Sequence, residues 1–457
     1  MIKKWFLLLY LLVWATPMVS AQQQKWTLEA CVNYAWSHNI SVKQSELDVQ
    51  AAEVEKFAGF GAFLPSASAN TSHSWNVGLN QNITTNILEN QTTQFTSLGA
   101  NVGIDIYKGL QNQQRFRKAK LSVIATQYQL EKMKDDIGLN VANAFLQIVF
   151  NKESLKVQLD QLAISEKQLL RTQQLVDAGA LPRGDVLDSK ATVAADKQKV
   201  VVAENTLLIS KLSLAQLLQL DNFQDFDIVE GDYEAKQSEV MFQTPAAIIA
   251  KAKENRIELK ISKTNVAIAE KEVTIAKGAY QPTIQGYYGF NSRISYADIP
   301  LFDNTGNLIG TRGPLPFMDQ FNNNKGHQFG IQLNVPIFSG FAVKYNVMRS
   351  KVALERSKIA YSQSELDLER SIYTAYTDAQ GAYNSYESAL SALDARRSAF
   401  EYAQERFNVG LMNTFEYNQA QTLFVNAQSE VVRTKFDYIF RTKVVEFYFG
   451  IPIILKQ

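Results

Sequence analysis

Residues 406–417 read RFNVGLMNTFEY, and residues 175–186 read LVDAGALPRGDV. Each stretch has a glycine at its fifth position, follows a long run of helical pattern and precedes a second one. A glycine just after a helix is typical of a left-handed turn, which other residues adopt only at a cost. The two stretches therefore predict two similar helix–turn–helix joints, 231 positions apart.

The joints belong to an internal repeat that covers almost the whole mature chain. The halves align at an offset of 217 positions around Pro65 and Pro282, and at an offset of 231 from Gly109 and Gly340 onward. The difference of 14 residues predicts one insertion, between residues 294 and 325. A period this long indicates a duplicated unit of about 220 residues.

Both halves predict the same order of elements: a helix that ends before a proline, two strands, a long helix, the joint and a return helix. The long helix would span about 100 Å, as much as the two shorter helices end to end, so the linker and the tail should lie at an equator. We expect a first repeat at 22–220 (helix 28–61, strands 66–77 and 95–107, long helix 111–176, return helix 186–219), an equatorial linker at 221–243, a second repeat at 244–450 (helix 245–278, strands 282–293 and 327–338, long helix 342–407, return helix 417–449) and a tail at 451–457.

The N-terminus predicts export from the cytoplasm. Lys3 and Lys4 precede a short apolar run, and Val19-Ser20-Ala21 fits the small-x-small pattern of a cleavage site. We therefore expect residues 1–21 to be a cleaved signal peptide. No later stretch is apolar for long enough to predict a transmembrane helix, although strands that cross a membrane have a much weaker signal.

The expected strands alternate in the manner of a membrane β-barrel. Residues 96–106 place Leu98, Val102 and Ile104 on one face and small or polar residues on the other. Open sheet edges are not tolerated in lipid, and four strands cannot close a barrel. Three chains would supply twelve strands, so closure predicts a trimer. The alternative is a soluble sheet domain beside a helical bundle, which does not account for helices of this length.

The chain resembles the TolC-like outer membrane efflux family. The resemblance rests on WTLEACVNYAWSHN at 26–39, the LPS turn at 64–66, NVPIFSG at 334–340 and RFNVGL at 406–411, together with the doubled layout. It implies a mainly α-helical chain with a membrane β-barrel portion, in a trimer that forms a twelve-stranded barrel on a coiled-coil-like α-helical barrel. It also implies a location in the outer membrane, with a long periplasmic extension.

The function implied by this resemblance is a passive exit duct of a tripartite efflux or type I secretion system. Its partners would be a periplasmic adaptor and, through the adaptor, an inner-membrane pump. We find no residues for catalysis and expect no enzyme activity and no cofactor. A non-conducting structural spacer of the periplasm and outer membrane remains the alternative function.

The second joint is the expected adaptor-docking tip. Val409, Gly410 and Leu411 match the stretch that contacts the adaptor in the family, and apolar side chains at an exposed tip need a partner. In the first joint, Ala178, Gly179 and Ala180 are the weaker candidates. The helix–strand hinges are expected at Pro65, Pro282, Gly109 and Gly340.

Asp185 and Asp188 are candidates for the aperture of the duct. At a spacing of three they share a helix face, and three chains would place six carboxylates in a ring. The family usually carries such aspartates in the second repeat, where this chain has Glu416 and Gln419. The alternative, that Asp185 only stabilises the start of a helix, remains open.

Composition and the remaining motifs narrow the class of protein further. The net charge of +1 leaves no basic excess for nucleic acid. His38, His73 and His327 lack metal-ligand spacing and predict surface or barrel positions. The single cysteine, Cys31, excludes an intrachain disulfide and predicts a small apolar core residue.

Overall fold

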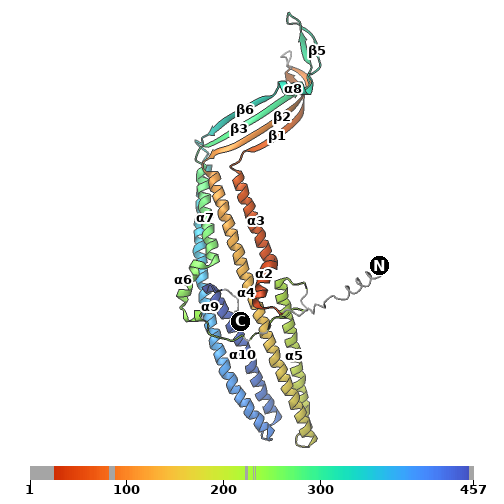
Figure 1. The fold of residues 1–457 in the computed structure, drawn as a ribbon, viewed down its shortest axis with the longest axis vertical. Coiled ribbons are helices and arrows are strands. Elements are labelled where there is room, and N and C mark those ends of the chain that lie inside the picture. The colour runs from red at the N-terminus through yellow and green to blue at the C-terminus, as the bar shows by residue number, and fades with distance from the viewer. Residues whose placement is uncertain (1–24, 82–87, 222–224, 230, 232, 452–457) are drawn as a thin grey trace, which may run out of the picture. The chain divides into compact units, whose positions relative to one another are not determined.

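The computed structural model describes residues 25–81, 88–221, 225–229, 231 and 233–451 (Figure 1). The expected signal peptide and tail residues 452–457 lie outside these ranges. The described chain divides into two compact units. One unit, drawn from 48–127 and 261–361, holds the strands and the first part of each long helix. The other, drawn from the described residues of 25–47, 128–260 and 362–451, holds the rest of the long helices, both return helices and the linker.

The strand-bearing unit is built on one antiparallel sheet. Its central pair joins the two halves of the chain, since Leu98 lies opposite Ser292 and Gly103 opposite Tyr287. The sheet is open within one chain, because each edge strand has one partner strand among the described residues. Its strands, in spatial order, are β1 (Ser66–Gln81), β2 (Leu88–Lys108), β3 (Thr283–Ser295) and β6 (Gly326–Asn334).

Three strand ends differ from those expected by more than two residues. β1 and β2 run on to Gln81 and from Leu88, because polar residues there continue the antiparallel ladder. β6 ends at Asn334 and not at the expected 338, since Pro336 has no N–H group to donate to the ladder.

The two faces of the sheet differ in chemistry. Cross-strand register places most branched apolar and aromatic side chains on one face, and mainly small or amide side chains, together with Phe95 and Tyr287, on the other. Phe329 and Ile331 on the apolar face are 81% and 72% exposed. The apolar face carries Leu98, Ala100, Val102, Ile104, Tyr288, Phe290, Phe329, Ile331 and Leu333, and the polar face carries Ser68, Asn70, Asn101, Gln285, Gln328 and Gln332.

The extra residues of the second repeat form a hairpin and a short helix between β3 and β6. These are β4 (Ile299–Phe302), β5 (Leu308–Arg312) and α8 (Phe317–Asn323). Gln320 fastens α8 to the end of β3, because its buried amide accepts from the backbone N–H of Ser295 and donates to the Ser295 carbonyl, both at 2.9 Å.

The strand-to-helix junctions show why glycine occupies both expected hinges. Gly109 and Gly340 have φ of 57° each, and the next residues, Leu110 and Phe341, are also left-handed. A Cβ on Gly109 would lie 2.1 Å from the carbonyl oxygen of Gly278. The hinge at Gly109 is therefore fixed by conformation and by close backbone contact. Pro65 and Pro282 immediately precede the first residues of β1 and β3.

The helices expected at 28–61 and 245–278 are each broken once, which corrects the sequence prediction. α2 (Leu28–His38) and α3 (Ile40–Gly61) meet at Asn39, and α6 (Pro245–Asn255) and α7 (Ile257–Gly278) meet at Arg256. Both residues take extended backbone angles and lie 217 positions apart. At each break the side chain contacts another helix, and the Asn39 amide oxygen also caps α3 by accepting from the N–H of Ser41 at 2.9 Å.

The ties at these breaks are equivalent in position but different in chemistry. Asn39 donates to the carbonyl of Leu217 at 3.0 Å, near the end of α5 (Arg183–Leu218). The Arg256 guanidinium lies 4.1 Å from the ring centre of Phe447, near the end of α10 (Thr414–Phe449), and binds Glu258 at 2.9 Å. Each return helix therefore ends against a break in a preceding helix.

The long helices are α4 (Gln111–Asp177) and α9 (Ala342–Asn408), and the return helices start three residues before the expected 186 and 417.

A large hydrophobic core lies where α2, α4, α5 and the linker meet. Cys31, Phe145 and Ile228 are fully buried there, and burial raises the pKa of the Cys31 thiol to about 12. Asp227 holds the linker against α4 and α5 through Lys152 at 2.8 Å and Lys211 at 3.0 Å.

Replacing Gly109 by alanine should destabilise the fold more than the same substitution at a left-handed glycine with open space around it. Gly306, in the β4–β5 turn with φ of 85° and open space around it, is the matched control. Gly306→Ala should cost about 1–2 kcal/mol for the left-handed backbone alone. Gly109→Ala adds the clash with Gly278, so its thermal unfolding, followed by circular dichroism, should occur at a clearly lower temperature. Equal unfolding temperatures would contradict the close contact.

Candidate functional site

The two joints have the same backbone construction. Gly179 and Gly410 have φ of 76° and 78°. The N–H of Ala180 donates to the carbonyl of Leu175, and the N–H of Leu411 to that of Arg406, both at 2.8 Å. These bonds form the Schellman motif, which closes a helix end with a left-handed glycine. The two halves of the repeat therefore match even in the individual hydrogen bonds of their joints.

The second joint presents apolar side chains to solvent. Val409 and Leu411 are each 69% exposed and Phe415 is 77% exposed. Just behind them, Phe407 and Tyr417 are buried with ring centres 4.8 Å apart and hold the two helices together. The exposed residues can therefore be changed without disturbing the packing that forms the joint. In the first joint, Ala178, Gly179 and Ala180 are exposed but small.

The candidate aperture residues differ in their surroundings. Asp188 is exposed, whereas Asp185 is half-buried and accepts a hydrogen bond from the Thr414 hydroxyl at 3.4 Å. α5 begins after Pro182 and no side chain caps it. Asp185 therefore does not act as a capping residue, although it lies in the positive first turn. In the second repeat Asn413 caps α10 and Glu416 is exposed.

The two helical hairpins are linked near the joints by polar contacts. The Arg171 guanidinium, on α4, donates to the carbonyl of Asn408 at 3.5 Å, and the contact between Thr414 and Asp185 joins α10 to α5. Further along, the Gln421 amide on α10 donates to the Ser165 hydroxyl at 3.3 Å. These links fix the first repeat against the second inside one chain.

Asp196 is the centre of a buried polar layer that sequence reasoning missed. It is 3% exposed and accepts from Ser165 at 2.7 Å and from Gln161 at 3.0 Å. Burial raises its pKa, but hydrogen bonds from Ser165, Lys199 and Gln161 outweigh burial and leave the pKa below its usual range. The sequence did contain a signal for this layer, because Asp196 stands at a position of α5 where the helical pattern predicts an apolar contact residue.

The histidines and acidic residues do not gather into a metal site among the residues that the structure describes. His73 contacts Thr96 at 2.8 Å and Gln94 at 2.8 Å, on the sheet. His327 contacts the Tyr288 hydroxyl at 2.8 Å, also on the sheet, and His38 stacks on Tyr34.

Solved structures match this fold along most of its length. The outer membrane protein VceC from Vibrio cholerae is 14% identical, with a TM-score of 0.76 over 93% of this chain and 96% of that chain. The CmeC outer membrane channel of Campylobacter jejuni is 17% identical, with a TM-score of 0.72 over 93% and 85%. The MtrE outer membrane channel of Neisseria gonorrhoeae, solved in an open state, is 13% identical, with a TM-score of 0.70 over 93% and 89%. At these identities the likeness concerns the fold.

None of the curated proteins compared with the chain matches it. The family model described as outer membrane efflux protein matches residues 32–219 and 248–439, which lie in the two repeats. Because these ranges make up most of the chain, the protein belongs to the outer membrane efflux protein family.

Proposed function

We propose that the protein is a passive duct across the outer membrane, assembled from three chains, which receives cargo from a periplasmic adaptor and an inner-membrane pump. The observation that carries the proposal is the open sheet with one apolar and one amide-rich face. Such a sheet suits lipid on one side and water on the other. Conductance of the purified protein in a planar bilayer tests the proposal. A stable trimer that does not conduct would favour the alternative function, a structural spacer.

The edges of the sheet support a closed ring of several chains. β1 and β6 each leave one row of backbone groups without a partner strand among the described residues, and such rows are costly in lipid. The internal repeat supplies the missing pairing, because β6 corresponds to β2 and β1 to β3. β6 should therefore pair with β1 of the next chain, as β2 pairs with β3.

The register of this joint between chains follows from the same correspondence. Leu98 opposite Ser292 within the chain becomes Phe329 opposite Trp75 of the neighbouring chain. Phe329 and Trp75 are 81% and 61% exposed in the single chain. Their pairing would cover two large aromatic side chains with each other.

Unpartnered stripes on the helices support the same arrangement. α9 exposes an apolar residue at every seventh position, and α3 exposes a shorter stripe with the same spacing. Heptad spacing is typical of helices that pack along their length. α5 is long and apolar enough to cross a membrane by length and composition alone, which is weak evidence for a span. The stripes are Tyr345, Val352, Ile359, Leu366 and Tyr373 on α9, and Ile40, Leu47 and Val54 on α3.

A disulfide should form between chains at the proposed register. In the variant with Phe329→Cys and Trp75→Cys, the two Cα atoms should lie within the range that a disulfide requires. Mild oxidation should then convert the protein to a covalent trimer on a denaturing gel. Phe329→Cys with Leu79→Cys, four residues further along the same face, is the control and should stay monomeric. Monomers from both variants would refute the pairing.

The exposed tip residues support docking of an adaptor at the second joint. Leu411→Asp should leave assembly and heat stability unchanged, because the buried Phe407–Tyr417 contact remains. It should abolish export, since an unpaired charge buried in an interface costs several kcal/mol. Susceptibility of cells to exported toxicants measures this. Ile309→Asp, at a residue 65% exposed on β5, is the control and should export normally.

Full export by the Leu411→Asp trimer, with the adaptor still cross-linking to the joint, would show that the joint is only a turn. Ala180→Asp makes the matched change in the first joint. It should have the smaller effect, because Ala180 offers the adaptor only a methyl group.

Asp185 and Asp188 support a carboxylate ring at the aperture. Replacing both by alanine should lower cation selectivity and weaken block by multivalent cations by about tenfold, because opposite charges at close range dominate such binding. Single-channel recording measures both quantities. Glu416→Ala is the matched variant of the second repeat. If Glu416→Ala alone changes the block, the second repeat and not the first lines the aperture.

A further inference from the structure

Tyr287 lies across a glycine on the polar face of the sheet, where β3 and β6 run side by side (Figure 1). Its cross-strand partner on β6 is Gly330. A Cβ on Gly330 would point to the same face as Gln328 and Gln332, and it would lie 2.8 Å from the Tyr287 hydroxyl oxygen. The ring therefore rests on β6. Tyr287 is still 40% exposed, so the other side of the ring is open to water.

The first repeat has the same arrangement without an aromatic ring. Asn70 and Gly99 match Tyr287 and Gly330, and a Cβ on Gly99 would lie 2.8 Å from the Asn70 amide oxygen. An aromatic ring over a cross-strand glycine can stabilise a sheet. Since an amide covers Gly99 equally closely, covering the glycine does not require a tyrosine. The exposed face of the Tyr287 ring is therefore not explained by packing alone.

Exposed side-chain amides surround the ring. On β2 the partner of Tyr287 is Gly103, and a Cβ there would have one neighbouring atom within 4 Å, the Ser66 hydroxyl oxygen at 4.0 Å. The space beside the ring is therefore open. Residues two positions along a strand share a face, and amides both donate and accept hydrogen bonds. The amides at such positions around the ring are Asn101, Gln285, Gln328 and Gln332, and all four are exposed.

The charges on this face do not favour an ion of either sign at Tyr287. Among the polar-face residues whose side chains the structure describes, the charged ones are Asp105, Lys108 and Arg293. Asp105 and Lys108 pair at 2.7 Å. The Arg293 guanidinium stacks 3.7 Å from the ring centre of Phe95 and lies about 20 Å along β3 from Tyr287. The surface at Tyr287 therefore combines an aromatic ring with uncharged hydrogen-bonding groups.

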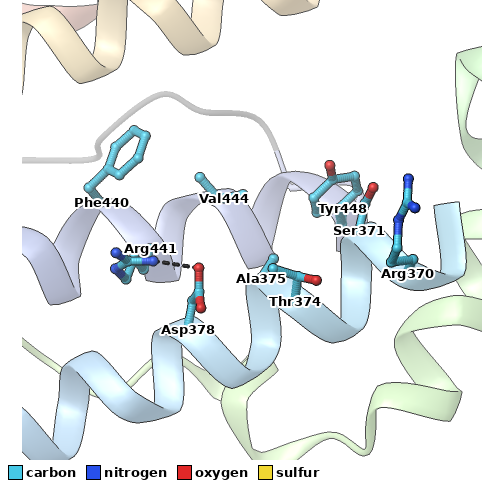
Figure 2. Close-up of a pocket in the computed structure, with 9 residues that line it drawn as sticks. All are labelled: Arg370, Ser371, Thr374, Ala375, Asp378, Phe440, Arg441, Val444 and Tyr448. Atoms are coloured by element: carbon cyan, nitrogen blue, oxygen red, sulfur yellow. Dashed lines mark hydrogen bonds and ion pairs between the residues drawn. The ribbon is translucent and has the colours of Figure 1, made fainter. Parts of the chain in front are cut away.

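The groove between α9 and α10 in the helical unit offers no such combination (Figure 2). It has a volume of about 360 Å³, and its lining includes two arginines. Arg441 pairs with Asp378 at 2.5 Å, and Arg370 pairs with Asp367 at 3.0 Å. Because each guanidinium group already binds a carboxylate, the charges of the groove do not select a ligand.

We propose that Tyr287 and the amides around it form a binding surface for neutral sugar rings, one in each chain. The C–H groups of a pyranose ring pack on an aromatic face, while its hydroxyl groups bond to amides. The proposal rests on the proposed duct, which turns the polar face toward the lumen. In the proposed register Gly330 lies opposite Ser74 of the neighbouring chain. So small a residue would leave the ring open in the assembly.

Saturation-transfer NMR of maltohexaose with the purified assembly in lipid nanodiscs tests the binding, with empty nanodiscs as background. The sugar should show saturable transfer, and polyethylene glycol of the same mass should show none. Tyr287→Asn, which copies the first repeat, should weaken sugar binding about tenfold, whereas Tyr287→Phe should retain it because the ring remains. Equal transfer to both probes, or undiminished binding by Tyr287→Asn, would overturn the proposal.

Two further variants separate the ring from a general effect on the sheet. Tyr288→Leu changes the next residue, on the apolar face, and should bind the sugar as the unchanged protein does. Asn70→Tyr, added to Tyr287→Asn, should restore binding, because residue 70 already lies across Gly99 and beside Asn101. Loss of binding in Tyr288→Leu, or no recovery with Asn70→Tyr, would show that the ring does not carry the binding.

Channel recording tests the lumenal placement separately. Maltohexaose should lower the conductance of the unchanged protein reversibly, and Tyr287→Asn should conduct normally and be insensitive to the sugar. Normal conductance without sugar binding would refute the surface and leave the duct standing. An assembly that binds the sugar through Tyr287 but never conducts would refute the duct and the lumenal placement, and leave the binding surface standing.

Discussion

Unpaired backbone groups at the edges of the sheet are the constraint on which the other features depend. Among the described residues of one chain, β1 and β6 end the sheet, and the proposed location in the membrane would place these edges in lipid, where they are costly. The same chain already contains a joint between unlike strands, β2 against β3, that an identical neighbour can copy. The helices carry the same need for a neighbour. The proposed assembly would cover the heptad stripes of α3 and α9 and the exposed apolar side chains of α5.

Much of this fold could be predicted from the sequence because duplication makes every feature appear twice. The joints at Gly179 and Gly410 and the hinges at Gly109 and Gly340 are visible as glycines at matching positions, and all four are left-handed in the structure. The length of the long helices follows from an uninterrupted pattern. The alternation of the strands is clear enough to separate the two faces before any pairing is known.

The features that escaped prediction depend on contacts distant in sequence. Asn39 caps α3 locally through the N–H of Ser41, but its bond to the end of α5 and the contact of Arg256 with the end of α10 join segments distant in sequence. In the sequence Asp196 looks like any charged residue, and only the fold brings Ser165 and Gln161 within hydrogen-bond distance of it. The hairpin of β4 and β5 lies in an insertion without a counterpart, so the repeat carried no information about it. The candidate tip and aperture residues were found by position, and their roles remain proposals.

The pairing of β2 with β3 also has a consequence for the order of folding. β1 and β2 are neighbours in sequence and can form a hairpin early, but Leu98 meets Ser292 only after nearly two hundred further residues have been made. Pairing between such distant segments is intrinsically slow. For that interval the first hairpin carries an exposed apolar face and two free edges, a combination that promotes aggregation. The start of β1 is polar and rich in serine and asparagine, which lowers that risk. β1 is made first and waits longest for a partner, and its polar start is the part least prone to aggregate.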